Sequence, residues 1–274
     1  MTIASIMVYV DFDDATEARV RLAAEIAAEF NAALIGISGW PLRKDEASRL
    51  VTIEHPPAPD GRLEAILQLL EALGQRFRKI AGANPHGVEW RSSTDFPREF
   101  AATAARAADL LVIGREFSPD DVYRTYDPGT IILAAGRPVL TVPPGLHRLQ
   151  MSRVLVAWKG TREARRAVHD ALPFLQRAKV VDIAAVSLPG AAGAAAEIAD
   201  VAQYLGRHNV AVSRQIATAV SEDEGAGLLD LAKQQQADLI VAGAYGRTRL
   251  SEWIFGGVTR QLLTTSPIPC LFSN

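Results

Sequence analysis

The stretch Ala107-Ala-Asp-Leu-Leu-Val-Ile-Gly114 recurs in the second half of the chain as Gln236-Ala-Asp-Leu-Ile-Val-Ala-Gly243. Each copy is a run of apolar residues that starts after an Ala-Asp pair and stops at a glycine. Short apolar runs bounded by turn residues are typical of strands buried in a parallel sheet. A proline and another apolar run follow each copy, at Val139–Val142 and at Cys270–Ser273. The repeat predicts the same buried strands in both halves.

The beginnings of the two halves match as well. Ser5-Ile-Met-Val-Tyr-Val-Asp11 corresponds to Ser152-Arg-Val-Leu-Val-Ala-Trp158, and a Glu-Ala-Arg triplet follows at 17–19 and at 163–165. The chain has 274 residues, more than the roughly 100–150 residues of a common domain. We therefore interpret the sequence as a tandem duplication.

A proline-rich segment separates the halves. Val142-Pro-Pro-Gly-Leu-His-Arg-Leu-Gln150 follows the last strand of the first half, and its prolines and glycine suit neither a helix nor a strand. The predicted modules are residues 1–147 and 148–274.

Within each half, apolar runs alternate with segments of helical period, which is the pattern of β-α-β units. The predicted fold class is α/β, with two tandem doubly wound modules, each a parallel sheet of five strands with helices on both faces. The predicted strands lie near 5–10, 33–38, 87–91, 109–114, 138–142, 153–158, 180–186, 210–216, 238–243 and 269–273. We expect a flavodoxin-type winding, with a ligand crevice between the loops that follow strands one and four.

Helices are predicted between the strands. In the second half they span about 161–176, 193–208, 221–236 and 258–265. Thr161 is a candidate N-cap, and Ser221-Glu-Asp-Glu224 has the pattern of a capping box. The first half adds a loop rich in proline and charge, from Gly39 to Asp60.

The composition excludes several classes of function. The 29 basic and 31 acidic residues give a net charge of -2, without the basic excess of a nucleic-acid-binding protein. No apolar run approaches the roughly 18 residues of a membrane span, and the N-terminus does not resemble a signal peptide, so we expect a soluble, cytoplasmic protein. Cys270 lies in an apolar run and is expected to be a buried thiol, and the five histidines lack metal-ligand spacing.

A glycine-rich loop in the second half has phosphate-binding chemistry. It runs from Gly243 through Gly246 and Gly256-Gly257 to the start of a predicted helix at Val258. Glycines let the backbone approach an anion, and free N–H groups at a helix start favour negative charge. We expect the anion to be contacted also by the side chains of Arg247, Arg249, Thr259 and Arg260.

At these residues the chain resembles the universal stress protein family, whose nucleotide-binding members have the motif G-x2-G-x9-G-[S/T] here. Gly243, Gly246 and Gly256 have the spacing of that motif, and Gly257 stands where Ser or Thr is expected. Both openings, both Ala-Asp-Leu strands and both closing strands fit the family. The resemblance implies a tandem member with an adenine nucleotide alpha-hydrolase-like fold.

The resemblance also implies a ligand, ATP or a related adenine nucleotide with Mg²⁺, in the C-terminal module only. The implied phosphate contacts are Gly246, Gly256, Gly257, Val258 and Thr259, and the implied adenine and ribose contacts are Val186, Ala242 and Gly243. Nucleotide-binding members have an acidic residue after strand one, where this sequence has Lys159. A cation there either pairs with phosphate or marks a changed ligand.

The first half of the chain departs from the family's nucleotide-binding pattern in the opposite way. It keeps the acidic residue, Asp11, but after Gly114 it reads Arg-Glu-Phe-Ser-Pro-Asp-Asp121, without the second glycine. Carboxylates in this loop repel phosphate. We expect no nucleotide in the first module.

The resemblance implies a binding and regulatory protein of the stress response, in which nucleotide occupancy biases contact with a protein partner. No nucleophile elbow, catalytic triad or P-loop is visible, so no catalytic residue is predicted, although weak ATP hydrolysis stays open. The alternatives are an enzyme that hydrolyses ATP or adenylates a substrate, and a structural scaffold with no active pocket. Trp158 and Trp253 either stack on a base or pack in the core.

Family members pair through their last strands. The resemblance therefore implies that the strands at Val139–Val142 and Cys270–Ser273 meet antiparallel within one chain, as an intramolecular pseudo-dimer. That pairing would cover two exposed sheet edges. A further homodimer of chains is compatible with the sequence.

Overall fold

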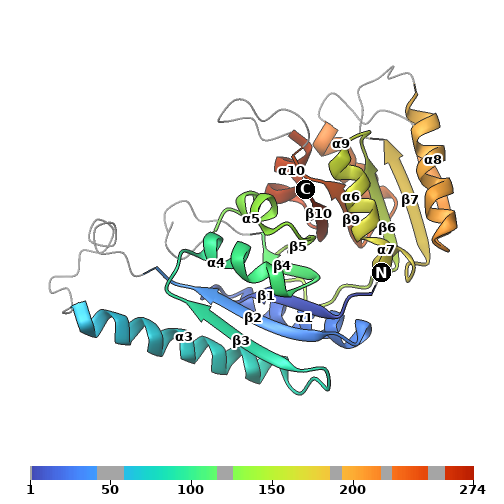
Figure 1. Cartoon of the computed structure of the whole chain (residues 1–274). Coiled ribbons are helices and arrows are strands. Elements are labelled where there is room, and N and C mark those ends of the chain that lie inside the picture. The colour runs from blue at the N-terminus through green and yellow to red at the C-terminus, as the bar shows by residue number, and fades with distance from the viewer. Residues whose placement is uncertain (1, 42–58, 116–125, 186–192, 217–223, 246–256) are drawn as a thin grey trace.

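The computed structural model describes residues 2–41, 59–115, 126–185, 193–216, 224–245 and 257–274. Ten strands form one sheet in the order β3-β2-β1-β4-β5-β10-β9-β6-β7-β8. The strands are β1 (Ser5–Tyr9), β2 (Ala33–Gly39), β3 (Val88–Ser93), β4 (Leu110–Gly114), β5 (Val139–Val142), β6 (Arg153–Trp158), β7 (Val180–Ala185), β8 (Val212–Ile216), β9 (Leu239–Gly243) and β10 (Cys270–Ser273). The two halves of the chain meet at β5 and β10 (Figure 1). The predicted α/β class with two five-stranded parallel units is confirmed.

The strand order within each half differs from the expected flavodoxin type. The first half has the order 3-2-1-4-5, and the second repeats it as β8-β7-β6-β9-β10. The flavodoxin order is wrong because β3 pairs with β2 at the outside of the sheet, and the chain then crosses to the other side of β1 to form β4. The order reverses between strands one and four, so the expected position of the crevice is unchanged.

Strand composition explains which strands lie inside the sheet. β4, with the sequence LLVIG, is buried along its whole length between β1 and β5. β3 (VEWRSS) and β8 (VSRQI) have polar residues and no fully buried position, and both lie at the ends of the sheet. Polar side chains are tolerated there because an edge strand is only partly covered.

The last strands of the two halves pair antiparallel, as predicted. Cys270 lies opposite Thr141, Leu271 opposite Leu140, and Phe272 opposite Val139. The hydroxyl of Thr141 also donates to the carbonyl of Cys270 at 3.3 Å. This pairing joins two sheets of five strands into one, with β3 and β8 as its outer strands.

Helices cover both faces of the sheet. One face packs on α1 (Thr16–Phe30), α3 (Pro59–Ala81), α6 (Arg162–Asp170), α7 (Leu172–Leu175) and α8 (Ala194–Arg207). The other face packs on α4 (Pro97–Ala104), η1 (Ala105–Ala107), α5 (Pro128–Ala135), α9 (Glu224–Gln234) and α10 (Gly257–Thr265). Each face has one apolar core that runs through both halves of the chain.

One predicted helix begins where expected but is divided in two. The Thr161 hydroxyl caps α6 by accepting from the Ala164 amide at 3.2 Å, as predicted. The helix predicted to continue to residue 176 instead stops at Asp170 and restarts as α7. Pro173 explains the break, because its ring has no amide hydrogen and clashes with the preceding turn. Of the predicted capping box Ser221–Glu224, residues 221–223 lie outside the described residues.

The only cysteine of the chain lies in the interior, as expected. Cys270 is fully buried in β10, and burial raises the pKa of its thiol to about 12.

Among the helices that the structure describes, none has the length and apolar character to cross a bilayer. Within the same residues, no group of three or more His, Cys, Asp or Glu side chains is placed to hold a metal ion.

Candidate ligand site at the carboxyl edge of the second module

The loop after β6 and the first residue of α9 meet at the carboxyl edge of the second module. The ammonium of Lys159 lies 3.4 Å from the carboxylate of Glu224, which is the first residue of α9. The Lys159 side chain is 58% exposed, so this pair adds little to stability. The ammonium therefore remains accessible to a ligand in solvent.

Gly243 ends β9 against the first turn of α6. A Cβ on Gly243 would stand 2.6 Å from the carbonyl carbon of Glu163 and even closer to the amide nitrogen of Ala164. Only glycine fits where two backbones approach so closely. The absent side chain thus accommodates α6, and Ala242 beside it is buried in the strand.

The first turn of α10 lies at the same edge, because α10 follows β9. Gly257 opens the helix and is exposed, and no atom of the described residues lies within 4 Å of the position of a Cβ there. Val258 is half-buried, whereas Thr259 is buried. The first amides of a helix have no partner within it and carry partial positive charge.

The structure describes only part of the predicted site. It brings Lys159, Gly243 and the first turn of α10 to one edge of the sheet. Val186, Gly246, Arg247 and Gly256 lie outside the described residues, as do Arg249 and Trp253.

The equivalent crevice of the first module is occupied by a buried arginine. The Arg19 side chain, 2% exposed, donates to the carboxylate of Asp11 at 2.8 Å and to that of Asp13 at 3.2 Å. It also donates to the backbone carbonyl of Tyr9 at 2.9 Å. Burial raises the pKa of the Asp11 carboxyl, although the Arg19 guanidinium opposes that effect.

A second contact completes this cluster. A Cβ on Gly114 would collide with Nη1 of Arg19 and lie 3.2 Å from its Cζ. The amide of Gly114 donates to the hydroxyl of Tyr126 at 2.9 Å. Arginine and tyrosine side chains therefore cover the end of β4, where a ligand would have to bind.

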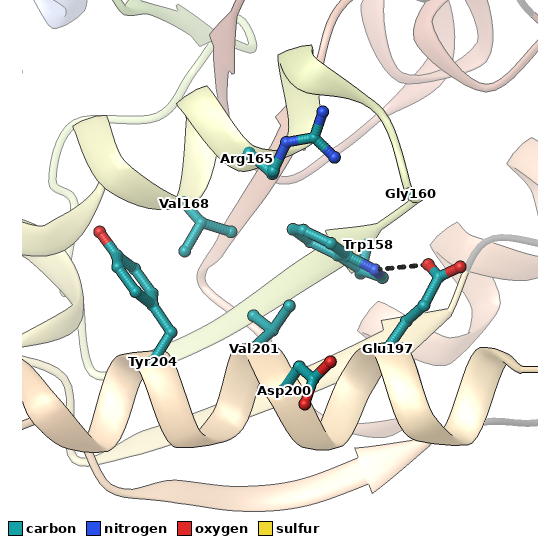
Figure 2. Close-up of a pocket in the computed structure, with 8 residues that line it drawn as sticks. All are labelled: Trp158, Gly160, Arg165, Val168, Glu197, Asp200, Val201 and Tyr204. Carbon is teal, nitrogen blue, oxygen red and sulfur yellow. Dashed lines mark hydrogen bonds between the residues drawn. The ribbon is translucent and has the colours of Figure 1, made fainter.

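Sequence reasoning missed a groove between α6 and α8. It has a volume of about 580 Å³, within the roughly 300–1,000 Å³ of small-molecule sites. Trp158 lies at its centre and donates its indole N–H to the carboxylate of Glu197 at 3.1 Å (Figure 2). Trp158 also belongs to the apolar core and is 8% exposed, which agrees with the core interpretation of that residue.

The two modules wound 3-2-1-4-5 and joined through their last strands define a tandem doubly wound α/β protein. The model of the Universal stress protein family matches residues 151–273. This segment therefore belongs to the universal stress protein family, and the chain combines it with a first module of the same fold.

Solved structures agree with that architecture. A universal stress protein from Archaeoglobus fulgidus DSM 4304 aligns with a TM-score of 0.71 and 15% identity, over 98% of each chain. A protein of unknown function from Pseudomonas aeruginosa PAO1 aligns with a TM-score of 0.56 and 16% identity, over 99% of this chain and 92% of that one. At such identity the likeness concerns the fold. Among curated proteins, none matches.

Proposed function

We propose that the second module binds ATP or a related adenine nucleotide at its carboxyl edge, and that the chain is a binding and regulatory protein of the stress response. The observation that carries this proposal is the start of α10 at Gly257, where no atom of the described residues lies within 4 Å of the position of a Cβ. Amides at such a helix start favour phosphate.

Lys159 supplies a charge that suits this ligand. Its ammonium is held by one exposed pair with Glu224 at 3.4 Å, and a phosphate group can replace that partner. A phosphate oxygen and an ammonium form a charge-assisted hydrogen bond. The replacement of the family's acidic residue by Lys159 is therefore compatible with nucleotide binding. Any Mg²⁺ would bind chiefly through the phosphates.

The contrast between the modules supports a site in the second module only. In the first, Arg19 is ion-paired and packed against Gly114. Its guanidinium already has the carboxylates of Asp11 and Asp13 as partners. A phosphate there would have to displace both carboxylates.

A scaffold without an active pocket is the second candidate. The contact of Gly243 with Ala164 and Glu163 favours it, because the glycine's open face is filled by the protein itself. In that case the tandem chain would act only through its surface.

Thermal unfolding of the full chain with ATP, ADP and AMP, each with and without Mg²⁺, distinguishes the two candidates. A ligand at ten times its Kd stabilises the folded state by about 1.4 kcal/mol. We expect ATP at millimolar concentration to raise Tm, and Lys159→Gln to reduce that rise. Lys233→Gln, an identical change at an exposed position near the end of α9, is the matched control. An unchanged Tm with every nucleotide would support the scaffold.

A further inference from the structure

The groove between α6 and α8 has a wall from each helix and a floor of apolar side chains from the sheet and from both helices. Trp158, at the end of β6, forms the floor together with Val168 from α6 and Val201 from α8 (Figure 2). These side chains are at most 8% exposed, so their positions are fixed by the core. A groove with an apolar floor of this size suits one small, flat ligand.

The two walls have opposite charges. Glu197 and Asp200 lie on the α8 wall, and Arg165 lies on the α6 wall (Figure 2). Within the part of the chain that the structure describes, Asp200 and Arg165 form no ion pair. Glu197 accepts a hydrogen bond from the indole of Trp158 at 3.1 Å, which orients its carboxylate. Two carboxylates against one guanidinium make the groove net negative.

This groove differs from the nucleotide site proposed above. It lies on the face of the sheet covered by α6 and α8, whereas α10 covers the other face. Carboxylates on its wall would repel phosphate groups. Its chemistry selects for a cation instead.

We propose that this groove binds a small aromatic amine. The aromatic ring lies on Trp158 between Val168 and Val201, where it is removed from water. The protonated amine faces Asp200 and Glu197, and a charge-assisted hydrogen bond to a carboxylate fixes its orientation. Arg165 on the opposite wall repels the amine and so directs it toward α8.

Ligand-observed NMR on the full chain tests the proposal with three probes that share one ring. Tryptamine presents an ammonium, indole-3-propionate a carboxylate, and 3-ethylindole no charge. We expect tryptamine to bind about tenfold more tightly than 3-ethylindole, and indole-3-propionate to bind more weakly than either. Equal or tighter binding of indole-3-propionate would overturn the charge assignment.

Two variants locate the bound probe. Asp200→Asn removes a charge from an exposed position and should weaken tryptamine about tenfold, whereas Asp230→Asn on the exposed surface of α9 should not. Val201→Phe fills the groove and should abolish binding of both tryptamine and 3-ethylindole. Tryptamine affinity unchanged by Asp200→Asn would refute the proposal even if Val201→Phe failed to fold.

Discussion

The guanidinium of Arg19 lies against the backbone of Gly114, where the side chain of any larger residue would have to stand. In the first half of the chain, the positive charge at the end of β4 is thus supplied by the protein's own Arg19 side chain. The guanidinium is paired with Asp11 and Asp13 and almost completely buried. Arg19 links the loop after β1 to the end of β4.

Arg19→Ala should destabilise the protein by about 3 kcal/mol, because it leaves two partly buried carboxylates without their cation. Chemical denaturation at pH 7 measures this loss. Arg21→Ala is the control, since its pair with Glu17 is about half exposed and removal should change stability by about 0.5 kcal/mol or less. Similar losses in the two variants would contradict a structural role for the cluster.

The Cys270 thiol should make stability depend on pH in the alkaline range. Burial raises its pKa from 9.0 to about 12, so the folded state keeps the proton that the unfolded chain loses. The contribution is complete below pH 9 and is lost as the pH rises from 9 toward 12. Unfolding experiments on the wild type and Cys270→Ala should show a steeper loss for the wild type over this range. Parallel curves would rule out the thiol as the cause.

The two glycines at the carboxyl edge should respond differently to alanine. Gly243→Ala forces the strand end away from α6 and should destabilise by about 1–3 kcal/mol. Gly257→Ala adds a Cβ that has no atom of the described residues within 4 Å, so it should be neutral or stabilising by up to about 1 kcal/mol. Equilibrium unfolding compares them directly, and a large loss for Gly257→Ala would show that the turn is tightly packed.

Asp182 is a buried carboxylate in β7 with one oxygen that has no hydrogen-bond partner in the described part of the chain. Burial raises its pKa, and Arg214 and Arg153 oppose that shift. Ionised Asp182 therefore opposes folding at neutral pH, and Asp182→Asn should gain up to about 1 kcal/mol there. The gain should vanish in acid, where both states are protonated. Asp230→Asn on the surface should show no such pH dependence.

The buried strands could be predicted from sequence because they depend on local composition. The apolar runs at Leu110–Gly114 and Leu239–Gly243 are the buried fourth strands. The antiparallel pairing of β5 with β10 was available from the family resemblance. The strand order 3-2-1-4-5 could not be predicted, because no local pattern determines that β3 pairs with β2.

The Glu-Ala-Arg triplets show why the sites were harder to predict. In α1, Glu17 is exposed and Arg19 is buried, whereas in α6, Glu163 is buried and Arg165 is exposed. Asp11 and Asp13 attract the first arginine into the protein, and the second half has no such pair. Identical triplets therefore have opposite orientations because of residues elsewhere. The groove at Trp158 depends likewise on the spacing between two helices.

The covalent link from β5 to β6 places both halves in one chain, so the two sides of the β5–β10 pairing can differ in sequence. In a symmetric dimer, every substitution appears twice, so a residue that suits one side of an interface must also suit the other. Here Phe30 of α1 meets Phe174 of α7 edge to face, with ring centres 5.2 Å apart, and Arg177 stacks on Phe30. Because the two halves differ in sequence, this contact does not have to occur a second time with the roles of the two halves exchanged. The first half can thus keep a buried, ion-paired Arg19 while the second half keeps the largely exposed Lys159.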